Sequence, residues 1–165
     1  MARDGTETRR KLAEAALRLF VEKGIGETTT RDITGAAGVA EGTLYRHFES
    51  REDLAWTLFR ENYAAYARRM RDLVDEIDDP IEALRAIVRT WCAAFDRAPE
   101  VFRYLLLLQH EHVRRVTPDM ESPIKELRRL LVRAIERGAI GVDDPAVATA
   151  LVQGPLLQFA TSVVY

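Results

Sequence analysis

The stretch GVAEGTLYRHF, from Gly38 to Phe48, carries the side chains best suited to binding chemistry. Leu44 and Phe48 lie four residues apart and therefore share one face of a helix, where they can pin it to a core. The remaining faces offer hydrogen-bonding groups: Thr43, Arg46 and His47 on the opposite side, and Tyr45 at its edge. A helix of this width fits the DNA major groove, where such side chains can contact base edges. The pattern indicates a helix whose polar face is meant for a partner.

Two further helices are predicted to position this stretch. Apolar residues between Leu12 and Phe20 recur at helical spacing, and Gly24 supplies the left-handed residue that ends that helix. An acid three residues after a threonine, in Thr29-Thr30-Arg31-Asp32, marks the capped start of a short second helix. Gly38 then turns the chain into the polar stretch, which completes a helix-turn-helix arrangement. On periodicity alone, DNA binding and plain helix packing are about equally supported.

Start and stop signals divide the rest of the chain into further helices, with almost no strand alternation. They predict a fourth helix from Ser50 to the acidic run 75–79, a fifth from Asp79-Pro80 to Pro99, a sixth over 100–115, a seventh from Ser122-Pro123 to Gly138, and an eighth from Asp144-Pro145. Serine and aspartate accept hydrogen bonds from the free N–H groups of a first turn, and proline lacks the donor that would stay unpaired there. Pro155 is expected to bend the eighth helix, because it removes a donor and crowds the preceding turn. The sequence predicts an all-α fold.

Composition and charge limit the classes of protein. The chain has 165 residues, which fits one domain or a small domain that shares its core with a second. Its 24 basic and 26 acidic residues give a formal net charge of −2, so DNA binding must rest on the placement of charge. The single cysteine, Cys92, excludes an intrachain disulfide. We expect no secretory signal and no membrane span, and therefore a cytoplasmic protein without membrane partners.

Catalytic and metal chemistry have little support in the sequence. His110 and His112 lie two residues apart, so on a helix they point to nearly opposite sides and cannot easily chelate one ion, with or without Glu111. Cys92 has no catalytic partner in the sequence, and it packs more readily as a small apolar residue. The chain lacks a Gly-rich phosphate loop, an HExxH pattern and a nucleophile elbow. We predict no metal site, no cofactor and no enzymatic activity.

A dense set of residue identities runs from Leu12 to Phe59. It comprises Ala15-Ala16, Leu19-Phe20, Gly24, Thr30, Ile33, Ala37-Gly38-Val39, Gly42-Thr43-Leu44-Tyr45, Phe48 and Arg51-Glu52. This pattern resembles the DNA-binding domain of the tetracycline-repressor (TetR) family. Members are dimers whose N-terminal three-helix unit binds DNA, and whose variable C-terminal helices bind a small molecule and build the dimer. The resemblance implies a helix-turn-helix DNA-binding domain over 1–53 and a helical ligand-binding and dimerisation domain over 54–165.

The resemblance also implies which side chains contact DNA. Contacts to phosphate, backbone, groove edge or bases are implied at Thr30, Arg31, Thr43, Tyr45, His47 and Arg51, with Arg51 matching a phosphate-binding basic residue. Glu41, Gly42 and Arg46 occupy positions where members vary and where base choice is set. Many members have Ser or Thr where Ala40 stands, so this helix lacks an N-cap that is worth about 0.5–2 kcal/mol. Many also have Lys where Glu41 stands; an acid repels phosphate but can accept from a cytosine amino group.

A ligand pocket is implied on the fourth to sixth helices. There the chain carries bulky apolar side chains with a few polar ones: Tyr63, Tyr66, Met70, Trp91, Phe95, Phe102, Tyr104, Leu108, Gln109 and His112. The same residues could instead fill a core. As pocket residues they favour an apolar or aromatic small molecule, whose identity the sequence does not give.

Together these patterns predict a sequence-specific transcriptional repressor that a small-molecule effector releases from a palindromic operator. The alternative is an all-helical ligand-binding or interaction protein that has lost operator binding. We expect a homodimer that buries Val147, Leu151, Leu156 and Phe159, because a palindrome needs two recognition helices one DNA turn apart. The family usually has one more helix, so either a tail follows Tyr165 or the eighth helix and its neighbours form the interface.

Overall fold

The computed structural model describes residues 2–164, and it describes side chains at all of these positions except 2–4, 107–111, 113 and 163–164. Within that range the chain is helical and has no strand, which confirms the all-α fold class. The elements are α1 (Ala2–Lys23), α2 (Thr30–Ala37), the 3-10 helix η1 (Glu41–Arg46), α3 (Arg51–Glu76), α4 (Pro80–Arg97), α5 (Pro99–His112), the 3-10 helix η2 (Val113–Arg115), α6 (Pro123–Glu136) and α7 (Pro145–Val164).

Local capping signals set most helix starts where the sequence predicts them. Thr29 and Asp32 form a capping box at α2, each side chain accepting from the other's backbone N–H. Ser50 accepts from the N–H of Asp53 at the start of α3. Asp79 accepts from two N–H groups at the start of α4, where Pro80 occupies the first turn.

Two elements differ in detail from the sequence prediction. The polar stretch forms a 3-10 helix, in which the Thr43 N–H bonds the Ala40 carbonyl oxygen and the His47 N–H bonds that of Leu44. The predicted sixth helix divides into α5 and η2. The predicted eighth helix is α7, and Pro155 lies inside it.

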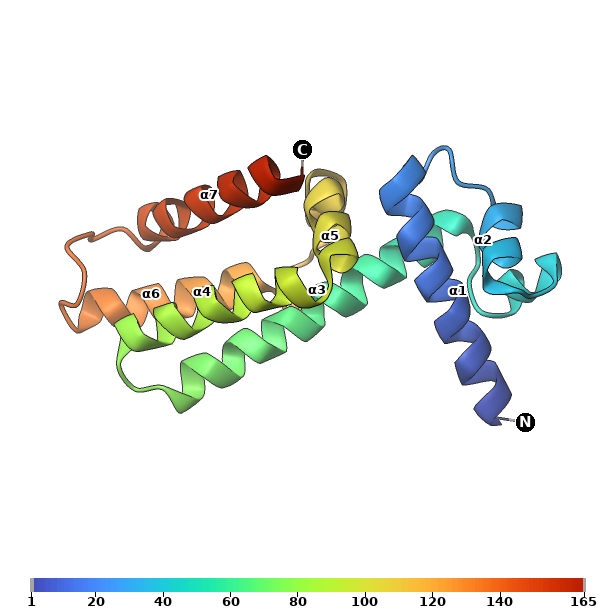
Figure 1. Ribbon diagram of the computed structural model, residues 1–165. Coiled ribbons are helices and arrows are strands. Elements are labelled where there is room, and N and C mark those ends of the chain that lie inside the picture. The colour runs from blue at the N-terminus through green and yellow to red at the C-terminus, as the bar shows by residue number, and fades with distance from the viewer. Residues whose placement is uncertain (1, 165) are drawn as a thin grey trace.

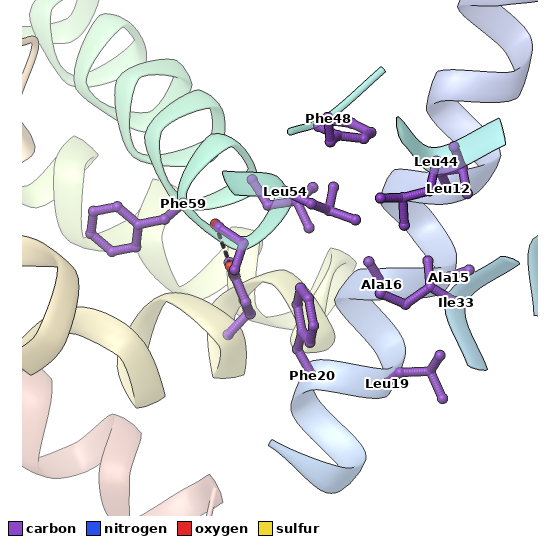
Figure 2. Packing of buried hydrophobic residues seen from close by; sticks show 13 residues of the cluster. Leu12, Ala15, Ala16, Leu19, Phe20, Ile33, Leu44, Phe48, Leu54 and Phe59 are labelled. Atoms are coloured by element: carbon purple, nitrogen blue, oxygen red, sulfur yellow. Dashed lines mark hydrogen bonds between the residues drawn. The ribbon is translucent and has the colours of Figure 1, made fainter. Parts of the chain in front are cut away.

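A first apolar core joins the N-terminal helices to the beginning of α3 (Figure 2). Leu12, Ile33, Leu44 and Leu54, from four different elements, are each fully buried in it. A second core lies among α3, α4, α6 and α7 and contains Met70, Val74, Ile87 and Leu130, among others. Both cores include residues of α3, which runs from one end of the molecule to the other (Figure 1).

The first core also takes in a residue from far along the chain. Tyr104 of α5 is only 1% exposed, and its hydroxyl donates to the Ala55 carbonyl oxygen at 2.6 Å. Its ring stacks with Phe20 of α1, with the ring centroids 6.2 Å apart. α5 therefore packs on both α1 and α3, and the N-terminal unit does not stand apart from the C-terminal helices (Figure 1).

In the part of the chain that the structure describes, no helix combines the length and the apolar character needed to cross a membrane.

Candidate DNA-binding surface and effector cavity

The turn between α2 and η1 has the geometry of a helix-turn-helix. Gly38 has φ = 67°, a left-handed conformation that favours glycine, and its N–H bonds the carbonyl oxygen of Gly35. The Val39 N–H bonds the Thr34 carbonyl oxygen, which closes the turn. Leu44 and Phe48 are 0% and 4% exposed, so they hold η1 against the core as the spacing predicts.

The predicted DNA-contacting residues lie on η1 and at the two neighbouring helix starts. Glu41, Gly42, Tyr45 and Arg46 are exposed on η1, Tyr45 by 57% of its surface. Thr43 is half-buried on η1, and His47 is half-buried directly after it. Arg31 is exposed and Thr30 half-buried at the start of α2, and Arg51 is half-buried at the start of α3. A short helix with one face fixed and the other exposed can present side chains to a DNA groove.

Arg51 makes contacts that the sequence pattern does not predict. Its Nη1 donates to the carbonyl oxygens of Gly26 and Thr28, at 3.0 and 2.7 Å. Its Nη2 and Nε donate to Glu52. Arg51 thus ties the loop between α1 and α2 to the start of α3, and any phosphate contact would be made in addition to these bonds.

A cavity of about 860 Å³ lies among α3, α4, α5, η2, α6 and α7. Five of the predicted ligand-binding residues line it: Tyr63, Tyr66, Met70, Trp91 and Phe102. Its volume falls within the range of about 300–1,000 Å³ that is usual for small-molecule sites. Burial raises the pKa of both the Tyr63 and the Tyr66 hydroxyls, with Cys92 a lesser cause at Tyr66, so these phenols face the cavity neutral.

Three other predicted ligand-binding residues, Phe95, Tyr104 and His112, lie outside the lining, and Tyr104 belongs to the first core. Phe95 is not part of the lining and packs edge-on against Phe102, with the ring centroids 5.3 Å apart. His112 is 4% exposed and lies against the rings of Trp56 and Phe59 instead. The predicted residues Leu108 and Gln109, like His110 and Glu111, lie outside the described side chains.

The lining also contains polar residues that sequence reasoning missed. They are Asn62, Arg69, Thr90, Arg97, Arg114 and Gln153. Helical spacing could have identified Asn62 and Arg69, which lie four residues before and three residues after Tyr66 on α3. No local sequence pattern predicts that Arg97 and Arg114 line the cavity, because only the packing of α4 and η2 against the other helices brings them there. Among the described residues, no group of three His, Cys, Asp or Glu side chains could hold a metal ion.

A row of aromatic rings on α3 connects the cavity with the N-terminal core. Tyr63 stacks on Phe59 and Phe59 on Trp56, with centroid distances of 5.1 and 5.9 Å. The Tyr63 hydroxyl also lies 3.2 Å from Oγ of Ser122, which precedes α6. Arg115 of η2 covers the Trp56 ring at 4.3 Å from its centroid. A ligand that moves Tyr63 would therefore disturb contacts of α3 with both α6 and the first core.

Helix-turn-helix geometry and an effector-sized cavity, joined by one long helix, define a class of ligand-responsive regulators. Residues 12–56 match the family model of the bacterial regulatory proteins of the tetR family. The HTH-type transcriptional repressor KstR2 of Mycobacterium tuberculosis (strain ATCC 25618 / H37Rv) is 31% identical over 134 residues, a match that covers 79% of this chain and 66% of that repressor. Residues 12–56 thus carry a tetR-family DNA-binding domain, and the chain as a whole is similar to a repressor with this domain. It spans just under two thirds of the length of this relative.

Solved structures agree with the assignment. The fatty acid degradation regulator FadR from Bacillus halodurans superposes with a TM-score of 0.83, covering 94% of this chain and 83% of that one, at 24% identity, which supports the fold. A gamma-butyrolactone receptor described as ArpA-like superposes with a TM-score of 0.71 at 28% identity, over 90% of this chain and 76% of the receptor.

Proposed function

We propose that this protein is a DNA-binding transcriptional repressor whose operator affinity falls when a small molecule enters the cavity. The observation that carries the proposal is the match of residues 12–56 to the tetR family over the same stretch that forms the helix-turn-helix. The similarity to KstR2, a transcriptional repressor, supports the same role. The similarity to a gamma-butyrolactone receptor supports the binding of a small-molecule effector.

Gel-shift and footprinting assays against DNA that flanks the protein's own gene test the first half of this proposal. A protected, twofold-related site that unrelated competitor DNA does not remove is the expected result. Binding that unrelated DNA competes away equally well would favour the alternative, a helical ligand-binding protein without an operator. The acidic Glu41 on the exposed face of η1 is the observation behind that alternative, since a carboxylate repels phosphate.

Base preference is expected to depend on Glu41 and Arg46. Arg46→Ala or Glu41→Gln should change the preferred operator sequence, with about 1–3 kcal/mol at stake for each good base contact. Selection of binding sites from a random DNA pool, followed by gel shifts on the selected sites, measures the change. Arg128→Ala, an exposed change on α6, is the control and should keep the original preference. An unchanged preference in both η1 variants would exclude these residues from base recognition.

We further propose a twofold dimer through α7. Val147, Leu151 and Phe159 are large apolar side chains exposed by 48%, 60% and 59%, and they recur at helical spacing on α7. Leu156, which the sequence analysis assigns to this interface, is half-buried and lines the cavity, so the proposed interface omits it. A palindromic operator fits such a dimer, because two recognition helices then meet successive turns of DNA.

Leu151→Glu is expected to convert the dimer to a monomer and to weaken operator binding. The introduced carboxylate would be buried against the partner without a cation, which costs several kcal/mol. Sedimentation at micromolar concentration measures the assembly state. Arg89→Glu, an exposed charge change on α4, is the matched control and should leave the dimer intact. A wild-type chain that sediments as a monomer would contradict the proposed dimer.

A further inference from the structure

The described charged residues that line the cavity are all basic. Tyr63, Tyr66, Trp91 and Phe102 form part of a mainly apolar wall, whereas the charged members of the described lining are all arginines: Arg69 on α3, Arg97 on α4 and Arg114 on η2. No aspartate or glutamate is among the described residues that line it. All three arginines are exposed, so their guanidinium groups can stay hydrated while their stems border the apolar space.

Two arginines of α3 that neighbour Arg69 in the sequence form ion pairs with carboxylates. Arg68 and Arg71 both form ion pairs with Glu121, and Arg71 pairs also with Glu126. Arg69 lies between them in the sequence but borders the cavity, and no ion pair joins it to any described carboxylate. The same is true of Arg97 and Arg114 in the described part of the chain. Three cations from three elements thus border one apolar space, and none of them has a partner among the described carboxylates.

We infer that the effector of this cavity is an amphiphilic anion, with an apolar body in the cavity and a carboxylate or phosphate group that pairs with one or more of Arg69, Arg97 and Arg114. The inference rests on the proposed function, because it treats the cavity as the effector site. A guanidinium group binds either anion through paired N–H donors, and these charge-assisted bonds are among the strongest available to a small ligand. A neutral ligand of the same apolar body would lack them.

Calorimetric titration of the full chain, without DNA, tests this inference with three probes that share one alkyl chain. They are decanoate, decyl phosphate and the neutral decanol. At least one anion is expected to bind about tenfold or more tightly than decanol, as charge-assisted hydrogen bonds provide. Stronger binding of decanoate points to a free carboxylic acid, and stronger binding of decyl phosphate points to a phosphate-bearing conjugate.

Arginine variants locate the anion. The combined variant Arg69→Gln, Arg97→Gln and Arg114→Gln should reduce the preference for the anion, and the three single variants show which arginine pairs with it. Decanol affinity should stay within about twofold, because glutamine keeps a polar stem but loses the charge. Arg89→Gln, exposed on α4 and outside the lining, should bind all probes like the wild type. Thermal melting confirms that each variant is folded.

The inference falls if decanol binds as tightly as both anions, if neither anion binds, or if the combined variant keeps the full preference. It also falls if Arg89→Gln loses as much preference as the three lining variants. Because DNA is absent, these results are separate from the proposed function. If the chain binds its operator but prefers decanol, only the inference about the anion is wrong. If it prefers the anion but never binds DNA specifically, only the proposed repressor role is wrong.

Discussion

Leu44→Ala is expected to lower the free energy of unfolding by about 2–5 kcal/mol, the usual cost of removing a fully buried leucine side chain. Leu44 is 0% exposed and pins η1 to the first core together with Phe48. The cavity left behind cannot close easily, because helices α1, α2 and α3 surround it (Figure 2). Urea unfolding, followed by circular dichroism, measures the change.

The adjacent residue provides the matched control. Tyr45 is 57% exposed, so Tyr45→Ala should change the free energy of unfolding by no more than about 0.5 kcal/mol. Operator affinity should fall in this variant by about 1–3 kcal/mol, as for the loss of one good base contact. If Tyr45→Ala destabilised the fold as much as Leu44→Ala, the assignment of an anchored face and a DNA-facing side to η1 would be wrong.

Occupation of the large cavity is expected to lower operator affinity about 5- to 150-fold, which corresponds to a coupling free energy of about 1–3 kcal/mol. The physical reason is that α3 borders the cavity through Tyr63, Tyr66 and Met70 and also begins beside η1. A ligand that moves Tyr63 acts on the stacked rings of Phe59 and Trp56, and so on the first core. Only a ligand that binds the non-operator conformation more tightly can shift the equilibrium.

Trp91 can report this occupation by fluorescence, because it lines the cavity. The second tryptophan, Trp56, lies outside that lining and is removed by Trp56→Phe, after a check that this variant keeps wild-type operator affinity. Apolar and aromatic compounds, with and without an anionic group, are screened by Trp91 quenching, and each hit is then tested in a gel shift. Compounds that bind yet leave operator affinity unchanged would show that the cavity is incidental to regulation.

Features that depend on short stretches of sequence could be predicted. Thr29, Ser50 and Asp79 cap the helices that follow them because each needs only backbone N–H groups two or three residues away. The burial of Leu44 and Phe48 followed from their spacing alone. Tyr63, Tyr66 and Met70 recur at helical spacing on α3 and line the cavity, in the region where the family resemblance implies a ligand pocket.

Features that depend on distant partners could not be predicted. Arg51 bonds to Gly26 and Thr28, whose carbonyl oxygens meet it only after α1, α2 and α3 have packed. Arg97 and Arg114 join the cavity in the same way, through the placement of α4 and η2. The 3-10 geometry of η1 was not predicted either, although the sequence shows that Ala40 provides no side-chain cap there.

The bond from the Tyr104 hydroxyl to the Ala55 carbonyl oxygen has a consequence for the order of events during synthesis. The two residues are 49 positions apart, so at about 5–20 residues per second the ribosome adds Tyr104 roughly 2–10 s after Ala55. During that interval the nascent N-terminal core lacks the ring that stacks on Phe20, and part of its apolar surface stays open to water. The DNA-binding end of the polypeptide is therefore made first but completed late, when α5 emerges to close it.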